Sequence, residues 1–540
     1  MAAAARLPTL RLRHVVEGDG VHYAALARDV LAGDWSGVGN PYWSNLWPAA
    51  IAATRFVTRL DVVTAGRVAS LVCGVALVLL VALLAERLFG RTTGLLAGLA
   101  AAGHPWLIHF STLVFTESFF ACLLVALLLA GWTVVESPSI PTAARAGLLG
   151  GLAVVTRPEA FAAVLVILAF VAARGREVRS AAVVTGAVAM PIVVFLAAHA
   201  LVCRYYYDVW DLGVGSKGAA NLLIGLATDD AAKERVTNEV TPAGENKLEV
   251  EMRESSLVGF TLAHPILVLT HTLRNTRLLA GSVWRVFPPV PLALGLSAFP
   301  RGAWPWGLAL LGLGSLALAV FGLGAGVADR NTRRGAAYLA AVIALYLLGL
   351  APLNVHDRLV VALAPLVLVF FGHGVAALAG RDETSRTLAA AVLVLTGLTS
   401  LYAVLRAPAL AYGDDPPVQR EVGLWIAAHA GPDTRVMTPS PAIAFYLFER
   451  GYEPSLKYNE VDLPWLGYEA LVDYGRQRDV RVLAAPEWYL ESARHPAAAR
   501  LTDPRADHPG LRLLATIGSE RPYRVHLYAL EPVVKTQQRP

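Results

Sequence analysis

Long apolar stretches separated by short polar connections dominate residues 62–405. A window of about 20 apolar residues predicts a membrane-spanning helix, because a helix satisfies its own backbone polar groups within lipid. The stretches 93–108 and 144–157 are expected to be tilted, broken or only partly crossing. The predicted spans are residues 62–85, 93–108, 113–135, 144–157, 159–174, 180–202, 304–326, 336–353, 358–379 and 387–405.

Composition agrees with this pattern. The chain has 540 residues, of which 56% are hydrophobic and only 16% charged, whereas a soluble protein carries about a quarter charged residues. The formal charge of +5 is explained by arginines that anchor the membrane helices, so it does not indicate nucleic-acid binding. Cys73 and Cys122 lie in apolar stretches and Cys203 at the end of one, so no disulfide or metal framework is predicted.

Arginines between the spans predict the orientation in the membrane, because cytoplasmic connections are enriched in Lys and Arg. The arginines fall in alternate connections, which assigns those to the cytoplasm and all the polar motifs of interest to the outer face. The cytoplasmic set is Arg87, Arg91, Arg145, Arg174, Arg176, Arg179, Arg330, Arg333, Arg334, Arg381 and Arg386. The outer set is residues 15–60, His109–Glu117, the long loop 203–303, Asn354–Arg358 and everything after Arg406.

Two segments, residues 284–300 and the first 14 residues, are harder to assign to one face of the membrane. Residues 284–300 are apolar but rich in Pro, and a span there would reverse the arginine rule, so an interfacial or re-entrant segment is predicted. The first 14 residues are too short and too interrupted by Arg to cross a bilayer, and they lack the apolar region of a signal peptide. This favours a start codon further upstream and a missing first helix; the alternative is that the first span inserts in reverse.

After Arg406 the pattern changes to alternating helices and short strands, ending in a predicted hairpin at residues 511–530. The sequence therefore predicts a polytopic α-helical membrane protein of about 10–11 transmembrane helices with a small C-terminal extracytoplasmic α/β domain. The proposed division is a membrane domain, 1–406, and a soluble domain, 407–540.

Four ordered motifs carry a family resemblance. They are "EGDGVHYAALARDVLAGDW", "HPWLIHFSTLVFTESFF", "GLLGGLAVVTRPEAF" and "NVHDRLVVALAPLVLVFFGHG". Together they resemble the GT-C superfamily of integral-membrane glycosyltransferases, and most closely the branch of protein O-mannosyltransferases and aminoarabinose transferases. The resemblance implies transfer of a sugar from a polyprenyl-phosphate donor to a lipid, glycan or protein acceptor at the outer face of the plasma (inner) membrane. It also implies the GT-C fold.

Asp19 is the predicted catalytic base. The family uses an acid in the first outer loop, which "EGDGVHY" matches at Asp19, to take the proton of the attacking hydroxyl, and an inverting reaction is expected. The alternative is a turn-forming Asp between Gly18 and Gly20. Glu17, His22 and Tyr23 are predicted to lie near the substrate, although packing at a helix start also explains His22 and Tyr23.

Glu117 is the second predicted catalytic acid, because an ionisable group at the end of a span is costly and the family has an acid there. The alternative is a favourable helix N-terminus behind a capping Thr116. His104 and His109 are five residues apart, whereas helical metal ligands are three or four apart, so a structural role is favoured.

Cations are needed to hold the departing phosphate, and an Arg does so through its fork of N–H donors. Arg358 matches the family's Arg before a Pro-containing span, with His356 as its expected partner; Asp357 is an alternative that would neutralise it. Arg204 and Lys217 are further candidates on the long loop. Arg157 is ambiguous, because Pro158 and Glu159 also suit a tight turn.

Two rival classes stay open at this stage: a transporter or lipid flippase, and a scaffold with an outer sensing domain. Transporters show paired halves and polar residues in mid-span, whereas the halves here differ and the acids gather on one face. No metal ligand set is encoded clearly, so a divalent cation is an open possibility for the cofactor, and the motifs specify neither the sugar nor the acceptor.

Overall fold

A computed structural model describes most of the chain. The described residues are 2–11, 15–16, 18–36, 43, 46–174, 178–212, 221–226, 235–236, 238–241, 247, 250, 257–290, 304–353, 355–406, 417–431, 434–447, 460–519, 521 and 523–531. Glu17, Lys217 and the second part of the predicted interfacial segment, 291–300, lie outside them.

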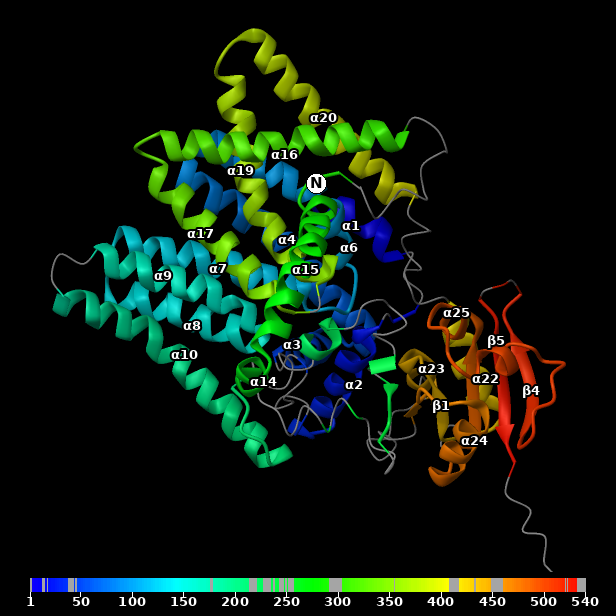
Figure 1. Cartoon of the computed structure of the whole chain (residues 1–540). Helices are drawn as coiled ribbons and strands as arrows, with labels where there is room; N and C mark the ends of the chain where they lie inside the picture. The colour runs from blue at the N-terminus through cyan, green and yellow to red at the C-terminus, as the bar shows by residue number, and fades with distance from the viewer. Residues whose placement is uncertain are drawn as a thin grey trace, which may run out of the picture.

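A helical domain makes up residues 2–406 (Figure 1). Among the described residues, six helical stretches are long and apolar enough to span a membrane. They are α4 (Val62–Phe89), α7 (Glu117–Glu136), α10 (Val178–Tyr207), α16 (Trp304–Ala328), α17 (Arg333–Leu350), and the stretch formed by α18 (Asp357–Val360), η3 (Val361–Leu363) and α19 (Ala364–Ala379). Two shorter apolar helices, α8 (Ile140–Thr156) and α9 (Phe161–Arg174), join them.

The predicted span 93–108 is broken. Helix α5 (Arg91–Gly103) ends before His104, which is extended, and α6 (Pro105–Phe110) begins at the next residue. A residue before Pro disfavours the helical conformation, and Pro has no N–H to continue the helix. With 13 residues, α5 is too short to cross a bilayer. The sequence-based expectation of a broken or partly crossing element is therefore confirmed.

Two other helices refine the predicted pattern. Helix α20 (Glu383–Arg406) covers the predicted span 387–405 but is not among the six apolar stretches. Helix α15 (Pro265–Val286) occupies part of the predicted outer loop 203–303, with short α14 (Leu257–Ala263) before it. Its buried residues recur at helical spacing while Ile266, Leu269 and Leu273 are exposed on another face. This helix lies inside the predicted segment between spans and was not itself predicted, because a search for long apolar runs does not detect a helix that is apolar on one face only.

The ends of the long helices gather on two faces. Arg87, near the end of α4, pairs with Glu136 at the end of α7, and Phe89 stacks on His373 of α19. The opposite ends of α4, α7 and α19 meet at the start of α7, near residues 111–117 and 357–363. The helix ends thus form two faces, and which of them is the outer one stays a prediction.

The C-terminal domain is a five-stranded sheet with helices packed on it. The strands are β1 (Val436–Thr438), β2 (Glu460–Asp462), β3 (Val482–Pro486), β4 (Leu511–Ile517) and β5 (Val525–Leu530), in the order β2-β1-β3-β5-β4. Strand β1 is parallel to β2 and β3, and the β4–β5 hairpin adds antiparallel to β3. The helices are α22 (Val418–His429), α23 (Pro441–Tyr446), α24 (Tyr468–Gln477), α25 (Glu487–Ser492) and α26 (Ala498–Leu501). The predicted helix–strand alternation and final hairpin are confirmed.

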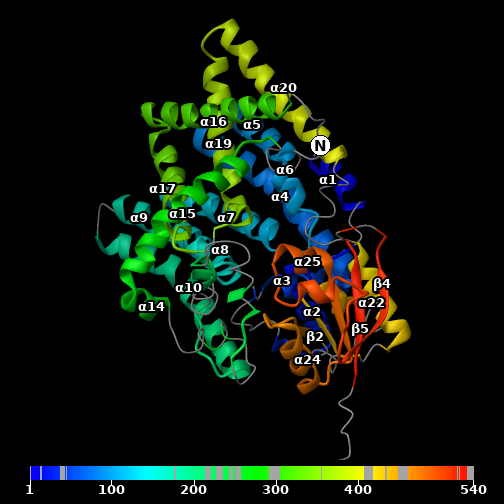
Figure 2. The same cartoon turned by 45° about the vertical axis from the view of Figure 1, so that its right-hand side comes forward.

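The chain begins with three helices, α1 (Ala2–Arg11), α2 (Asp19–Leu31) and α3 (Leu46–Thr58), of which α2 contacts the sheet domain. Helix α1 packs against α4, with Arg6 buried and donating to the Ala102 carbonyl. Helix α2 packs between α3 and α23 of the sheet domain, so that the domain lies beside α2 and α3 in both views (Figures 1 and 2).

Candidate active site

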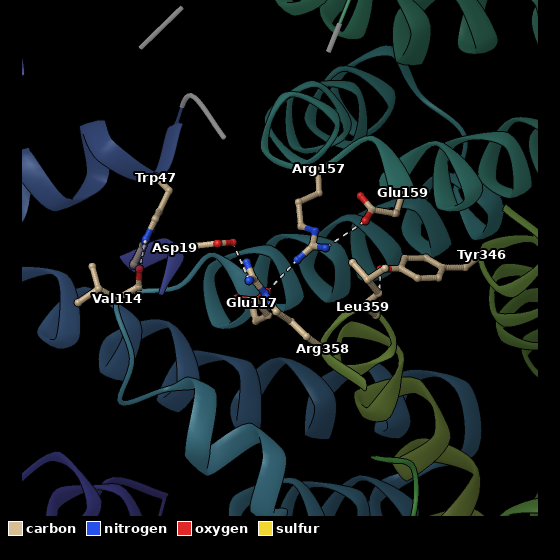
Figure 3. A network of polar contacts seen from close by, with 9 residues as sticks. All are labelled: Asp19, Trp47, Val114, Glu117, Arg157, Glu159, Tyr346, Arg358 and Leu359. Atoms are coloured by element: carbon tan, nitrogen blue, oxygen red, sulfur yellow. Dashed lines mark hydrogen bonds and ion pairs between the residues drawn. The ribbon is translucent and has the colours of Figure 1, made fainter. Parts of the chain in front are cut away.

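A chain of alternating acids and arginines lies where α2, α7, α8 and α18 meet (Figure 3). Asp19 is the first residue of α2, Glu117 the first of α7, and Arg358 the second of α18. Arg157 immediately follows α8. Residues that are hundreds of positions apart in the sequence thus form one polar site.

The Arg358 guanidinium bridges two carboxylates. Its Nη1 lies 2.6 Å from Oδ2 of Asp19, and its Nε donates to Oε1 of Glu117. The guanidinium carbon also lies 4.6 Å from the centre of the Phe115 ring. Arg358 is therefore oriented by two charged partners and an aromatic face.

A second arginine continues the chain. Nη1 of Arg157 lies 3.1 Å from Oε1 of Glu117, and its Nη2 lies 3.1 Å from Oε1 of Glu159. Glu117 thus accepts from both arginines through one oxygen. Sequence reasoning named Arg157 only as ambiguous and took Glu159 for part of a turn; the only signal was an Arg and a Glu flanking Pro158.

Local structure explains the position of Arg157. Because Pro158 follows, Arg157 takes an extended conformation (φ −153°, ψ 126°) and helix α8 ends at Thr156. A single 3-10 turn, η2 (Pro158–Ala160), then carries Glu159. The helix break therefore places Arg157 and Glu159 side by side between two short helices, α8 and α9.

The exposed fraction of the side chains changes along this series of ion pairs. The side chains of Asp19 and Arg358 are 32% and 24% exposed, whereas those of Glu117 and Arg157 are 1% and 8% exposed. A buried carboxylate is costly unless charged donors satisfy it, and Glu117 has two. Asp19 and Arg358 form the exposed end of this series of ion pairs.

The loop before Glu117 is held by neighbouring helices. Oγ of Ser70 donates to the Leu113 carbonyl at 2.5 Å, and Nε1 of Trp47 donates to the Val114 carbonyl at 3.3 Å. The alternative role of Thr116 as a side-chain cap for α7 is wrong, since its hydroxyl makes no cap hydrogen bond. Glu117 is placed by tertiary contacts and its arginines.

Close packing also needs glycine at the start of α2. A Cβ on Gly20 would lie 3.2 Å from Cβ of Val114, and one on Gly66 of α4 would lie 2.7 Å from Cγ1 of the same valine. A side chain at either position would push α2 or α4 away from the loop that leads to Glu117.

The residues beside Arg358 have other partners. Asp357 receives a two-point contact from Arg285 of α15, with Nε to Oδ2 at 2.8 Å and Nη2 to Oδ1 at 2.6 Å. The alternative that Asp357 neutralises Arg358 is therefore wrong, because Arg285 occupies both of its oxygens. His356 is exposed at the N-cap of α18, and its pairing with Arg358 stays a prediction. Arg285 was missed because α15 was not predicted.

His22 and Tyr23 lie on the first turn of α2. The His22 ring stacks on Trp43 at 4.5 Å, and Tyr23 is buried with its ring edge-on to Trp43 at 5.5 Å. Burial lowers the pKa of His22, although Asp19 opposes this, and burial raises the pKa of Tyr23. Both side chains therefore stay neutral beside Asp19 near pH 7, and their role in substrate binding stays a prediction.

The remaining candidates are placed elsewhere or not described. Arg204, at the end of α10, pairs with Asp208 four residues later, and its side chain is 45% exposed. This local pair leaves the predicted phosphate role of Arg204 untested. Glu17 and Lys217 are outside the described residues.

Metal ligands are not assembled among the residues that the structure describes: no group of three or more His, Cys, Asp or Glu could hold an ion. His104 is buried, and its Nδ1 accepts from the Leu107 N–H at the start of α6. The cations that this site presents to its carboxylates are guanidinium groups.

Comparison with known proteins identifies the architecture. The family of dolichyl-phosphate-mannose-protein mannosyltransferases matches residues 47–200. The solved structure of ArnT from Cupriavidus metallidurans bound to undecaprenyl phosphate matches 98% of this chain and 96% of its own, at 12% identity and a TM-score of 0.57. No curated protein matches the sequence directly.

A second type of relative has the same architecture. The archaeal oligosaccharyltransferase AglB from Archaeoglobus fulgidus, in complex with an inhibitory peptide and a dolichol-phosphate, matches 92% of this chain and 70% of its own, at 15% identity and a TM-score of 0.54. These matches confirm the GT-C-like fold, a membrane helical domain with a small C-terminal sheet domain, that the sequence motifs predicted.

Proposed function

We propose that this protein is a membrane glycosyltransferase that moves a sugar from a polyprenyl-phosphate donor to a hydroxyl of a lipid, glycan or protein acceptor at the outer face of the plasma membrane. The observation that carries the proposal is the contact of Asp19 with Arg358 at the exposed end of the ion-pair chain. A base and a phosphate-binding cation lie next to each other, as a displacement at a sugar carbon requires.

The proposed reaction assigns one step to each residue. The acceptor oxygen attacks the anomeric carbon, its proton passes to the Asp19 carboxylate, and the bond from that carbon to the phosphate oxygen breaks. Polyprenyl phosphate leaves with the electron pair of the broken bond, and the attack from the opposite side inverts the sugar carbon. Arg358 binds the phosphate oxygens and stabilises the charge that develops on them.

The ion pair between Asp19 and Arg358 gives the donor a role in preparing the base. A carboxylate that is held by a guanidinium is a weak base, because the pair favours its charged form. When the donor phosphate takes over Nη1 and Nη2 of Arg358, Asp19 loses its cation and becomes a better proton acceptor. Glu117 keeps Nε of the same guanidinium and so holds Arg358 in place during this exchange.

The relatives support the choice of donor class. ArnT is bound to undecaprenyl phosphate and AglB to a dolichol-phosphate in the matched structures. Both the fold and the family match favour an enzyme over the transporter or scaffold alternatives.

Turnover in membranes with labelled polyprenyl-phosphate sugars tests the proposal. Asp19→Asn keeps the shape but cannot accept the proton, so kcat should fall by about 10²–10⁴-fold with little change in donor KM. Arg358→Lys should fall by less than Arg358→Ala, because Lys binds phosphate as a point charge. Transfer by Asp19→Asn at the wild-type rate would contradict its assignment as the base.

The outer location has its own test. In a variant without native cysteines, Ser519→Cys in the sheet domain and Thr384→Cys at the start of α20 are both at exposed positions. An impermeant thiol reagent should label the first in intact cells and the second only after permeabilisation. The reverse pattern would place the site in the cytoplasm.

A further inference from the structure

The backbone just before Asp19 is held from two sides. The Val16 N–H donates to Oη of Tyr446 at 2.8 Å, and Nη2 of Arg67 donates to the Val15 carbonyl at 2.5 Å. Tyr446 belongs to α23 of the sheet domain and Arg67 to α4 of the membrane domain. All four residues are buried. The segment Val15–Val16 thus contacts both domains, and it ends three residues before Asp19, the proposed base.

The contact with Tyr446 is part of a larger interface. Ala442, Phe445 and Tyr446 of α23 share one apolar cluster with Val15, Val16 and residues of α2 and α3. The guanidinium of Arg28, in the last turn of α2, lies 4.0 Å from the centre of the Phe445 ring. Figure 2 shows the sheet domain beside α2 and α3. The sheet domain therefore contacts both ends of the helix that begins with Asp19.

Helix α2 has little local support at its start. Gly18, its N-cap residue, has φ 34° and ψ −118° and provides no side-chain cap. Helices that begin with a Ser, Thr, Asp or Asn cap are fixed locally, whereas this one depends on contacts from elsewhere. The two hydrogen bonds to residues 15 and 16 supply such contacts.

We propose that the sheet domain is a working part of the active site, in which Tyr446 is a positioning residue that sets Asp19 against Arg358 through the backbone of Val16. This inference rests on the proposed role of Asp19 as the base. Catalytic groups must be held closely, since a misplacement of about 1 Å can lower the rate by about 100-fold. Arg67 supplies the fixed reference on the membrane side, and Tyr446 makes the geometry depend on how the sheet domain docks.

Tyr446→Phe in the full-length protein tests the proposal, because it removes only the hydroxyl and keeps the ring in its cluster. Loss of one hydrogen bond that positions the base should lower kcat about 10-fold while donor KM stays within about twofold. Tyr528→Phe is the matched control: its hydroxyl donates to the Leu501 carbonyl at 3.0 Å inside the sheet domain, away from α2. This control should leave kcat unchanged.

Two further measurements separate positioning from a general loss of stability. In the Asp19→Asn background, Tyr446→Phe should lower the residual rate no further, because there is no base left to position. Amide hydrogen exchange of residues 15–23 should be faster in Tyr446→Phe and unchanged in Tyr528→Phe.

The outcomes distinguish this inference from the proposed function. If Asp19→Asn is inactive but Tyr446→Phe matches Tyr528→Phe in kcat and in exchange, the positioning role is overturned and the glycosyltransferase proposal stands. If wild-type protein transfers no sugar, the exchange experiment still decides whether Tyr446 holds the segment, and unchanged exchange would overturn the inference.

Discussion

The two ends of the ion-pair chain contain the same kinds of side chain in different surroundings. At the inner end, Glu117 and Arg157 are nearly inaccessible, and Glu159 is only 15% exposed. At the outer end, Asp19 and Arg358 keep about a quarter to a third of their side chains exposed. A buried pair cannot exchange its partners without a large desolvation penalty, whereas a partly exposed pair can. In the proposed function, the buried end therefore has a structural role and the exposed end carries the chemistry.

Arg358 and Glu117 connect these two roles. Glu117 anchors one nitrogen of Arg358 to the buried part, so that the rest of the guanidinium can change partner without leaving the site. Rigid support behind a reactive group is what catalysis requires of its surroundings. The buried end therefore contributes to activity through the position of Arg358.

The sharpest test of the comparison is Glu117→Gln. This variant leaves Arg157 and Arg358 without their shared charge, and breaking a buried pair costs about 3–5 kcal/mol. We expect a large fall in thermal stability in detergent together with loss of transfer. Glu136→Gln is the control at the other end of the same helix, where the pair with Arg87 is exposed and should contribute less than about 1 kcal/mol. Equal stability of the two variants would contradict a structural inner end.

Arg157→Lys sharpens the assignment of the second arginine. A single ammonium cannot bridge Glu117 and Glu159 in the geometry of the fork, so one carboxylate loses a charged donor. We expect a loss of about 1–3 kcal/mol in stability, measured by thermal unfolding, with donor KM unchanged in the protein that remains folded. A higher donor KM at unchanged stability would instead assign Arg157 to the phosphate site.

Arg285→Lys tests the support beside the outer end. Arg285 holds Asp357, the neighbour of Arg358, but its side chain is 43% exposed, so screening limits the contribution of this pair to about 1 kcal/mol. We expect donor KM to rise up to about fivefold, which corresponds to that free energy, with kcat little changed. Asp357→Asn should have an effect of similar size if the pair acts as a unit, and additive effects in the double variant would argue against it.

The last prediction concerns pH and a residue outside the ion-pair chain. The guanidinium groups keep their charge between pH 7 and pH 5. Histidine is the side chain whose protonation ordinarily changes in this range, and His495 lies in the sheet domain. Its Nε2 lies 3.0 Å from the Pro464 carbonyl and its Nδ1 accepts from the Ala497 N–H, an arrangement that needs the neutral ring. Burial lowers the pKa of His495 below its ordinary value, with the Pro464 carbonyl opposing this.

The sign follows from proton uptake. Below about pH 6.5 the unfolded chain binds a proton at this residue that the folded domain does not, so stability is lost as pH falls from about 6.5 toward the folded pKa. The slope should reach at most about 1.4 kcal/mol per pH unit. Amide exchange of residues 463–501 in the full-length protein should accelerate from pH 7 to pH 5 beyond its intrinsic pH dependence, and His495→Gln should remove this excess. The same acceleration in His495→Gln would exclude His495 as its cause.

Sequence reasoning predicted much of this protein because its signals are local. Apolar runs and the helix–strand rhythm after residue 406 depend on neighbours in the chain, and the structure confirms helices and strands that they predicted. The orientation inferred from the arginines stays a prediction. Asp19, Glu117 and Arg358 were each chosen from short motifs, and the structure places them together. The sheet order was not predictable, since β5 returns to β3 after β4 is complete.

Only the tertiary structure determined which residues contact one another in the site. Glu117 and Arg358 are 241 residues apart, and the partners of Asp357 and Val16 likewise come from distant helices. Motifs specify which charged groups are present, but the pairing depends on how α2, α7, α8 and α18 pack at one end of the bundle. Burial then determines which pairs are permanent, because desolvation separates the enclosed end of the chain from the exposed end. The sequence by itself determined the apolar helices and the kinds of charged side chain at the site. Packing determined which of these side chains pair and which stay exposed.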